Sequence, residues 1–198
     1  HKEYRRQRQM CIRDSHVLVQ SIALLLTATI AFAETTSYES SFQEGLTLRK
    51  QGKLAAAIHL FKKSVSQNPE FTKGHYLLGS ALIQAGKVQD GLIALKQTLT
   101  LDPQFVGAAQ AIGAALIERA NYQGAIPYLQ KATRLQPKNA ITYFTLAFAL
   151  AKNGNHKNAV QYYKHGLQFD PKHAFAHFSL AQSLAKLRQI PAAIAAYR

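Results

Sequence analysis

The chain has 198 residues, of which 47% are hydrophobic, so it can bury a core and is not globally disordered. Its formal net charge of +14 favours anionic partners, such as nucleic acid, acidic protein segments or membrane surfaces. The single cysteine, Cys11, excludes an intramolecular disulfide and a zinc site built from several thiolates.

Residues 1–15 are basic and polar, and they contain the only Met and the only Cys of the chain. The heptapeptide QMCIRDS, residues 9–15, can be back-translated into the mosaic-end adapter of transposase-based sequencing libraries. We therefore interpret residues 1–15 as translated adapter joined to a natural reading frame. They hold five basic and two acidic residues, so the remaining chain would keep a charge of +11 and no cysteine. The alternative is a natural basic segment at the start of a signal peptide.

An apolar stretch without Lys, Arg, Asp or Glu follows at residues 16–33 and ends in the tripeptide AFA. Small residues at the first and third positions before the cleavage site suit signal peptidase, and Glu34 would begin the mature chain. The stretch is short and polar for a spanning helix, which needs about 20 apolar residues. We expect a cleaved signal peptide, a linker over residues 34–37 and export to a bacterial periplasm. The alternative is an uncleaved inner-membrane anchor.

Export would change the meaning of the positive charge, because nucleic acid is scarce outside the cytoplasm. Acidic protein segments, anionic lipid headgroups and cell-wall polymers would then be the available counterparts. We expect a protein or peptide partner with acidic or apolar residues and no nucleic-acid partner. Membrane contact is expected only through an uncleaved signal segment, and the sequence leaves the oligomeric state open.

Prolines recur with a period of 34 residues in the rest of the chain, at Pro69, Pro103, Pro137 and Pro171. Because proline disfavours helical geometry at the preceding residue, each of them indicates the end of a helix. When each proline is numbered position 32, repeat units begin at residues 38, 72, 106, 140 and 174. The fifth unit stops at Arg198, inside its expected second helix, so we expect a fragment of a longer protein.

Each unit repeats one pattern of small and large residues. Gly or Ala occupies positions 8 and 20, Leu occupies position 11, and a large residue occupies position 24. Small residues let two helices approach closely, and large residues fill the space beside them. Gly52, Gly86 and Gly154 stand at position 15, where the end of a helix favours a positive φ. We predict two antiparallel helices per unit, over 72–85 and 88–101 in the second.

This pattern resembles the tetratricopeptide repeat family over residues 38–198. The resemblance rests on small residues at positions 8, 20 and 27 and on proline at position 32. It implies an all-α fold, a right-handed α-solenoid of about five stacked antiparallel helix pairs with the last one truncated. The family's aromatic residue at position 4 is present as Tyr143, while His75 and His177 replace it in two other units. The leucines at position 11 are expected in the core, Leu116 among them.

In this family the first helices of the units line a concave groove, and positions 2, 5, 9, 12 and 13 point into it. Here these positions carry more basic than acidic residues, together with six aromatic rings. The resemblance therefore implies a groove for an extended or helical peptide. The predicted peptide-binding residues are Phe42, Arg49, Lys50, Lys73, Tyr76, Gln110, Phe144, Phe148, Lys152, Phe175 and Phe178. The alternative is that some of these rings pack between neighbouring repeats.

We find no sequence signature of catalysis or of a cofactor: no nucleophile–base pair recurs, and no glycine-rich phosphate loop follows a strand. His173 and His177 have the i, i+4 spacing of metal ligands, but His177 occupies the aromatic position 4, so we predict packing and no metal site. The resemblance implies a non-enzymatic protein–protein interaction scaffold of the cell envelope. The alternative is the partner-selecting N-terminal half of an enzyme whose catalytic domain lies beyond Arg198.

Overall fold

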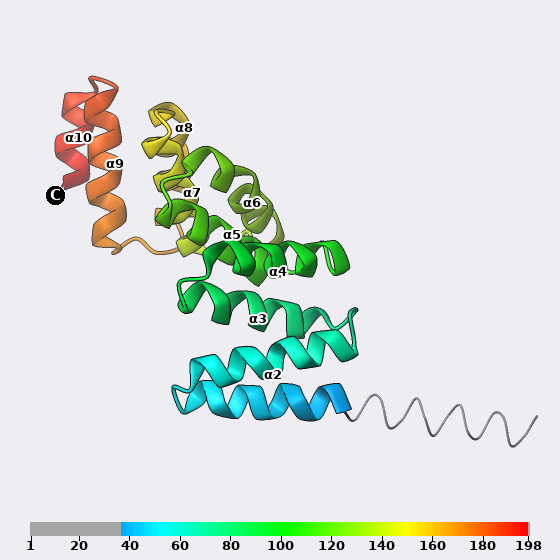
Figure 1. Ribbon diagram of the computed structural model, residues 1–198. Helices are drawn as coiled ribbons and strands as arrows, with labels where there is room; N and C mark the ends of the chain where they lie inside the picture. The colour runs from blue at the N-terminus through cyan, green and yellow to red at the C-terminus, as the bar shows by residue number, and fades with distance from the viewer. Residues whose placement is uncertain (1–36, 198) are drawn as a thin grey trace, which may run out of the picture. The chain divides into compact units, whose positions relative to one another are not determined.

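The computed structural model describes residues 37–197. All regular secondary structure in this range is helical, which confirms the predicted all-α repeat fold (Figure 1). The expected adapter and signal segments, residues 1–33, lie outside the described residues. The described residues divide into two compact units, one ending at Pro69 and the other beginning at Glu70, and each is described by itself. No helix within residues 37–197 combines the length and apolar character needed to cross a bilayer.

The described part of the first unit is one helix pair, formed by residues 37–50 and by α2 (Leu54–Gln67). Phe61 is fully buried between the two helices. A Cβ on Gly45 would lie 2.8 Å from the Phe61 ring, so this close approach requires the small residue at position 8.

Four further helix pairs make up the described part of the second unit. Their bounds are α3 (Thr72–Gln84) with α4 (Val88–Leu101), α5 (Val106–Glu118) with α6 (Tyr122–Leu135), α7 (Ala140–Lys152) with α8 (His156–Leu167), and α9 (Ala174–Lys186) with α10 (Ile190–Tyr197). Each second helix also packs against the next first helix, and α3, α5, α7 and α9 touch one another in that order (Figure 1). The first helices therefore share one face of the unit, and each begins at the residue numbered 1 in the predicted repeat.

The turn inside each pair is a helix end with a left-handed residue at position 15. In the α3–α4 turn Gly86 has φ +77°, and the N–H of Lys87 donates to the carbonyl of Leu82 at 2.9 Å. This is the Schellman arrangement, which satisfies the last carbonyls of a helix. The α5–α6 and α9–α10 turns have the same form without glycine. Ala120 has φ +55° and Arg188 has φ +60° at the equivalent position.

The core of the second unit lies between paired helices, where position 24 faces position 8. Leu95 and Leu129 are fully buried or nearly so, and a Cβ on the facing Gly113 would lie 2.6 Å from Leu129. Tyr163 is the largest fully buried side chain at this position. The apolar side chains between its two helices therefore form the core of each pair. Its other faces pack against the neighbouring pairs.

Position 11 differs from the expectation in the repeats that begin at residues 38 and 106. Leu82, Leu150 and Leu184 are buried, but Leu48 and Leu116 are only half-buried. Leu116 packs at the boundary of two hydrophobic clusters, one centred on α5 and one on α7. It therefore keeps part of its surface exposed, and Leu150 is the fuller core residue.

Candidate functional site

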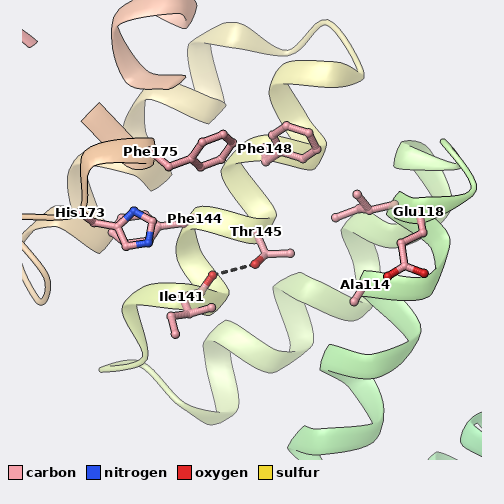
Figure 2. Close-up of a pocket in the computed structure, with 9 residues that line it drawn as sticks. Ala114, Glu118, Ile141, Phe144, Thr145, Phe148, His173 and Phe175 are labelled. Atoms are coloured by element: carbon pink, nitrogen blue, oxygen red, sulfur yellow. Dashed lines mark hydrogen bonds between the residues drawn. The ribbon is translucent and has the colours of Figure 1, made fainter. Parts of the chain in front are cut away.

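Two adjoining pockets lie along the first helices α5, α7 and α9. The first has a volume of about 330 Å³ and includes Glu118 of α5, Phe144 of α7 and His173 at the start of α9 (Figure 2). The second has a volume of about 760 Å³ and extends from α7 to α10. Phe148 and Phe175 line both pockets. We call the two pockets together the aromatic groove.

Aromatic rings form the wall between the two pockets. The Phe148 and Phe175 ring centroids lie 6.1 Å apart with the planes tilted by 44°, and Figure 2 shows the two side chains next to each other. Phe175 is 53% exposed and Phe178 47% exposed. The ammonium of Lys152 lies 5.5 Å from the centre of the Phe148 ring, within the range of a cation–π contact. Exposed apolar side chains that gather in one patch, as these rings do, are typical of binding surfaces.

Two of the predicted groove rings belong to the core instead. Phe144 is 4% exposed, and its ring lies over Gly166, where a Cβ would come within 2.5 Å of the ring. Phe42 is 8% exposed and packs against Phe61 in the first unit at 5.9 Å. Phe144 is buried because glycine at position 27 leaves room for its ring, although the residue still contributes to the lining of the first pocket. The contacts described for these two rings therefore lie inside their own helix pairs, whereas the alternative placed such rings between neighbouring repeats.

Three other predicted residues line neither pocket of the aromatic groove. Tyr76 is half-buried, and its ring packs against that of Phe105, the residue that precedes α5, with centroids 4.9 Å apart. The amide of Gln110 donates to the Thr142 hydroxyl at 2.7 Å and so links α5 to α7. Lys73 is exposed at the start of α3.

The remaining basic residues of the predicted set, Arg49 and Lys50, belong to the first unit. Arg49 is half-buried and Lys50 is exposed. The aromatic groove lies entirely in the second unit. It brings together the last five residues of the predicted set, which are Phe144, Phe148, Lys152, Phe175 and Phe178.

The second pocket also contains polar residues that the position rule did not select. Tyr163 of α8 and Ser179 of α9 line it, and so does His156 at the first residue of α8. The Tyr163 hydroxyl and the His156 Nδ1 are buried and make no hydrogen bond of standard geometry within the described residues. Burial raises the pKa of Tyr163, while the neighbouring Ser179 hydroxyl acts in the opposite direction.

A sequence signal for this polar floor exists at position 24. The repeats that begin at residues 72 and 106 have the purely apolar Leu95 and Leu129 there, whereas the repeat that begins at residue 140 has Tyr163. A phenol at a core position brings a hydroxyl that needs a partner. Ser179 and Ser183 are likewise polar residues on the buried side of α9.

The two histidines with metal-like spacing have other contacts. The Nδ1 of His173 accepts a hydrogen bond from the N–H of Ala176 at 3.2 Å, which caps α9, and its ring lies 4.5 Å from that of Phe144. The Nε2 of His177 lies 2.8 Å from the carbonyl oxygen of Pro171 and donates to it. Between residues 37 and 197 no three His, Cys, Asp or Glu side chains gather as a metal site would require.

Comparison with solved structures shows the same repeat architecture. "Crystal structure of MamA protein" has a TM-score of 0.78 and 23% identity, over 81% of this chain and 88% of that one. "MamA 41-end from Desulfovibrio magneticus RS-1" has a TM-score of 0.76 and 19% identity, over 81% and 91%. A further "Crystal structure of MamA" has a TM-score of 0.74 and 24% identity, over 77% and 90%. At these identities the likeness shows the fold alone.

At the level of sequence, no curated protein matches the chain. The family model described as "Anaphase-promoting complex, cyclosome, subunit 3" matches residues 20–98 and 118–198, which is more than half of the chain. The predicted helix pairs, the 34-residue period and this match agree. The chain therefore belongs to this family of tetratricopeptide-like repeats and is a protein-binding helical repeat.

Proposed function

We propose that the chain is a non-enzymatic interaction scaffold of the bacterial cell envelope that binds a partner peptide or helix in its aromatic groove. The observation that carries this proposal is the pair of exposed rings, Phe175 and Phe178, beside two pockets of about 330 and 760 Å³. Rigid aromatic side chains next to concave pockets are the usual anchors of protein interfaces. The family model is named for a subunit of a multiprotein complex, which is consistent with a binding role.

The size and shape of the aromatic groove favour a peptide with spaced apolar side chains. The two pockets are separated by Phe148 and Phe175, so one ligand side chain can enter on each side of these rings. An amphipathic helix presents such side chains at i, i+3, i+4 and i+7. Its affinity would come from burying the phenyl rings, which lose their contact with water on binding.

The charges along the groove give the ligand a direction. Glu118 is the acidic residue of the first pocket, whereas Lys152 and Lys186 line the second. A ligand with an acidic end over α9 and a neutral or basic end over α5 would match both. Opposite orientation would place like charges together, which costs affinity and slows association.

A displayed library of random peptides, selected on the full chain, tests the groove. We expect enriched peptides with aromatic or leucine residues at helical spacing, and a loss of affinity of more than tenfold for Phe148→Ala with Phe175→Ala. Ile93→Ala is the matched control, because Ile93 is 68% exposed on α4 outside the groove. If no peptide is enriched, or if the double variant binds as tightly as the control, the groove is not the binding surface.

The envelope location rests on the apolar segment over residues 16–33 and on its AFA ending. A fusion of the full chain to alkaline phosphatase, which is active only after export, tests it in a bacterial host. We expect high phosphatase activity that is lost when residues 16–33 are deleted. Equal activity of the two fusions would contradict export through this segment.

A further inference from the structure

The second pocket differs from the first because its floor is polar and unsatisfied. The Tyr163 side chain is 0% exposed, and its hydroxyl lies near enough to the Ser179 hydroxyl to feel it electrostatically, but the two make no hydrogen bond of standard geometry within residues 37–197. His156 contributes a second buried nitrogen in the same situation. Both residues line the pocket. Buried polar groups in native proteins are nearly always paired, so two such groups in the same pocket call for a further hydrogen-bond partner there, which a water or a polar ligand atom can supply.

The rim of this pocket is positively charged. Lys152 and Lys186 occupy the same position, the last residue of the first helix, in neighbouring units α7 and α9. Both line the second pocket, and no Asp or Glu does. Two lysines at the rim of one cavity, with no carboxylate among its lining residues, make its mouth attractive to an anion. An anionic group would therefore meet charge at the rim and hydrogen-bond donors at the floor.

We propose that the second pocket is a subsite for one carboxylate of the partner peptide, an Asp or Glu side chain, and this rests on the proposed function. Lys152 and Lys186 neutralise the carboxylate at the rim. On binding, the pocket opens enough for the Tyr163 hydroxyl, which is buried in the free protein, to donate a hydrogen bond to one of its oxygens. The methylene groups of the acidic side chain pack against Phe178 and Tyr197, whose ring centroids lie 5.9 Å apart. The aromatic groove would then read an acidic residue flanked by apolar ones.

The pocket presents two lysines and no arginine, so it offers an anion point charges and not a bidentate fork. We choose a carboxylate because the rings of Phe178 and Tyr197 suit the methylene groups of an acidic side chain, and the experiment below compares it with a phosphate. The family's known arrangement for free C-terminal carboxylates uses Lys at position 5 and Asn at position 9. Here those positions are Phe144 and Phe148 in the fourth unit and Phe178 and Gln182 in the fifth. The proposed subsite therefore depends on a different set of side chains.

The test uses the peptides selected on the full chain, each prepared with its acidic residue and with the matching amide, Glu→Gln or Asp→Asn. We expect the amide form to bind about tenfold more weakly, as for the loss of a charge-assisted hydrogen bond. Lys152→Met with Lys186→Met should remove this difference and leave the amide form unaffected. Lys164→Met is the control, because Lys164 is an exposed lysine of α8 that lines neither pocket.

Tyr163→Phe separates ligand binding from folding, because it keeps the ring and removes only the hydroxyl. We expect an unchanged thermal midpoint and about a fivefold loss of affinity for the acidic peptide only. Selected peptides that lack acidic residues, or acidic and amide forms that bind equally, would overturn the subsite while the groove stands. Preference for a phosphoserine peptide over its glutamate form would overturn the choice of carboxylate. Failure to select any peptide would overturn both proposals.

Discussion

Gly79 and Gly91 face each other across the α3–α4 pair with no room for a side chain on either. A Cβ on Gly79 would lie 2.9 Å from the carbonyl oxygen of Gly91, and a Cβ on Gly91 would lie 2.8 Å from the carbonyl oxygen of Gly79. The other units carry alanine at one or both of these two positions. The repeat formed by α3 and α4 therefore contains the helix contact with the least tolerance for an added methyl group.

We expect Gly91→Ala to destabilise the protein, by up to about 2 kcal/mol. Alanine favours the helix by about 1 kcal/mol, but its methyl group would press on backbone atoms, and such overpacking costs about 1–3 kcal/mol. The new methyl group would also lie 2.6 Å from the Ile83 side chain. Urea denaturation measures the change, with the exposed Gln89→Ala of the same helix as the control. A variant more stable than the wild type would contradict the close contact.

Ala120→Gly should stabilise the protein by about 0.5–1 kcal/mol. Ala120 has φ +55°, a conformation that costs an L-residue roughly 1–2 kcal/mol, whereas the added freedom of glycine in the unfolded chain costs somewhat less. The equivalent Gly86 already has φ +77°, so Gly86→Ala should lose about 1 kcal/mol. Thermal unfolding of both variants checks the pair. Shifts of the same sign would show that the two turns are not equivalent.

The turn at Ala120 could be predicted from the sequence period, because a helix end is determined by residues that are close to it in the chain. The 34-residue spacing and Gly86 place a helix end at position 15 in one unit, and the same register transfers it to units without glycine. The same register also identified the face of α7 and α9 that carries Phe148, Lys152 and Phe175.

Register alone could not predict which groove rings are buried, because that depends on single residues elsewhere. Phe144 and Phe178 both occupy position 5, yet they are 4% and 47% exposed. Phe144 is buried because Gly166, on a different helix, leaves space for its ring. Tyr163 is a similar case. The sequence shows a tyrosine at a core position, but only the structure shows that it lines the second pocket.

Lys87→Asn should stabilise the protein by about 1 kcal/mol by adding a helix cap. Lys87 precedes α4 with φ −85° and ψ 61° and makes no side-chain cap hydrogen bond. Asn121 and Asn155 stand at the same position of the next units with nearly the same backbone angles, and each accepts a hydrogen bond from an N–H in the first turn. An asparagine cap contributes about 0.5–2 kcal/mol.

Asn121→Ala tests the same cap in reverse. It should lower the free energy of unfolding by a similar amount, because it removes the 3.0 Å hydrogen bond that the N–H of Gly124 donates to the Asn121 side chain. Urea denaturation of both variants provides the measurement. If Lys87→Asn leaves the midpoint unchanged while Asn121→Ala lowers it, the two helix starts differ in a way that their backbone angles do not show.

Tyr163→Phe should make stability less sensitive to alkaline pH. Burial raises the pKa of Tyr163 in the folded protein, because the phenolate would lose its hydration, and the effect of Ser179 is smaller and opposite. In the unfolded chain the pKa is near 10, so above about pH 10 the unfolded state loses this proton first and is favoured. The contribution of Tyr163 is fully present below that pH and is lost as pH rises.

Urea denaturation at neutral pH and near pH 11 measures the effect as the difference between wild type and Tyr163→Phe. At neutral pH the variant should be as stable as the wild type or slightly more so, because the hydroxyl it removes has no partner of standard geometry among the described residues. In alkali the variant should become the more stable protein, since it carries no group to ionise at that site. If the stability difference between wild type and Tyr163→Phe were the same at both pH values, the Tyr163 hydroxyl would be in contact with solvent. The argument for a ligand in the second pocket from a buried, unpaired hydroxyl would then fail.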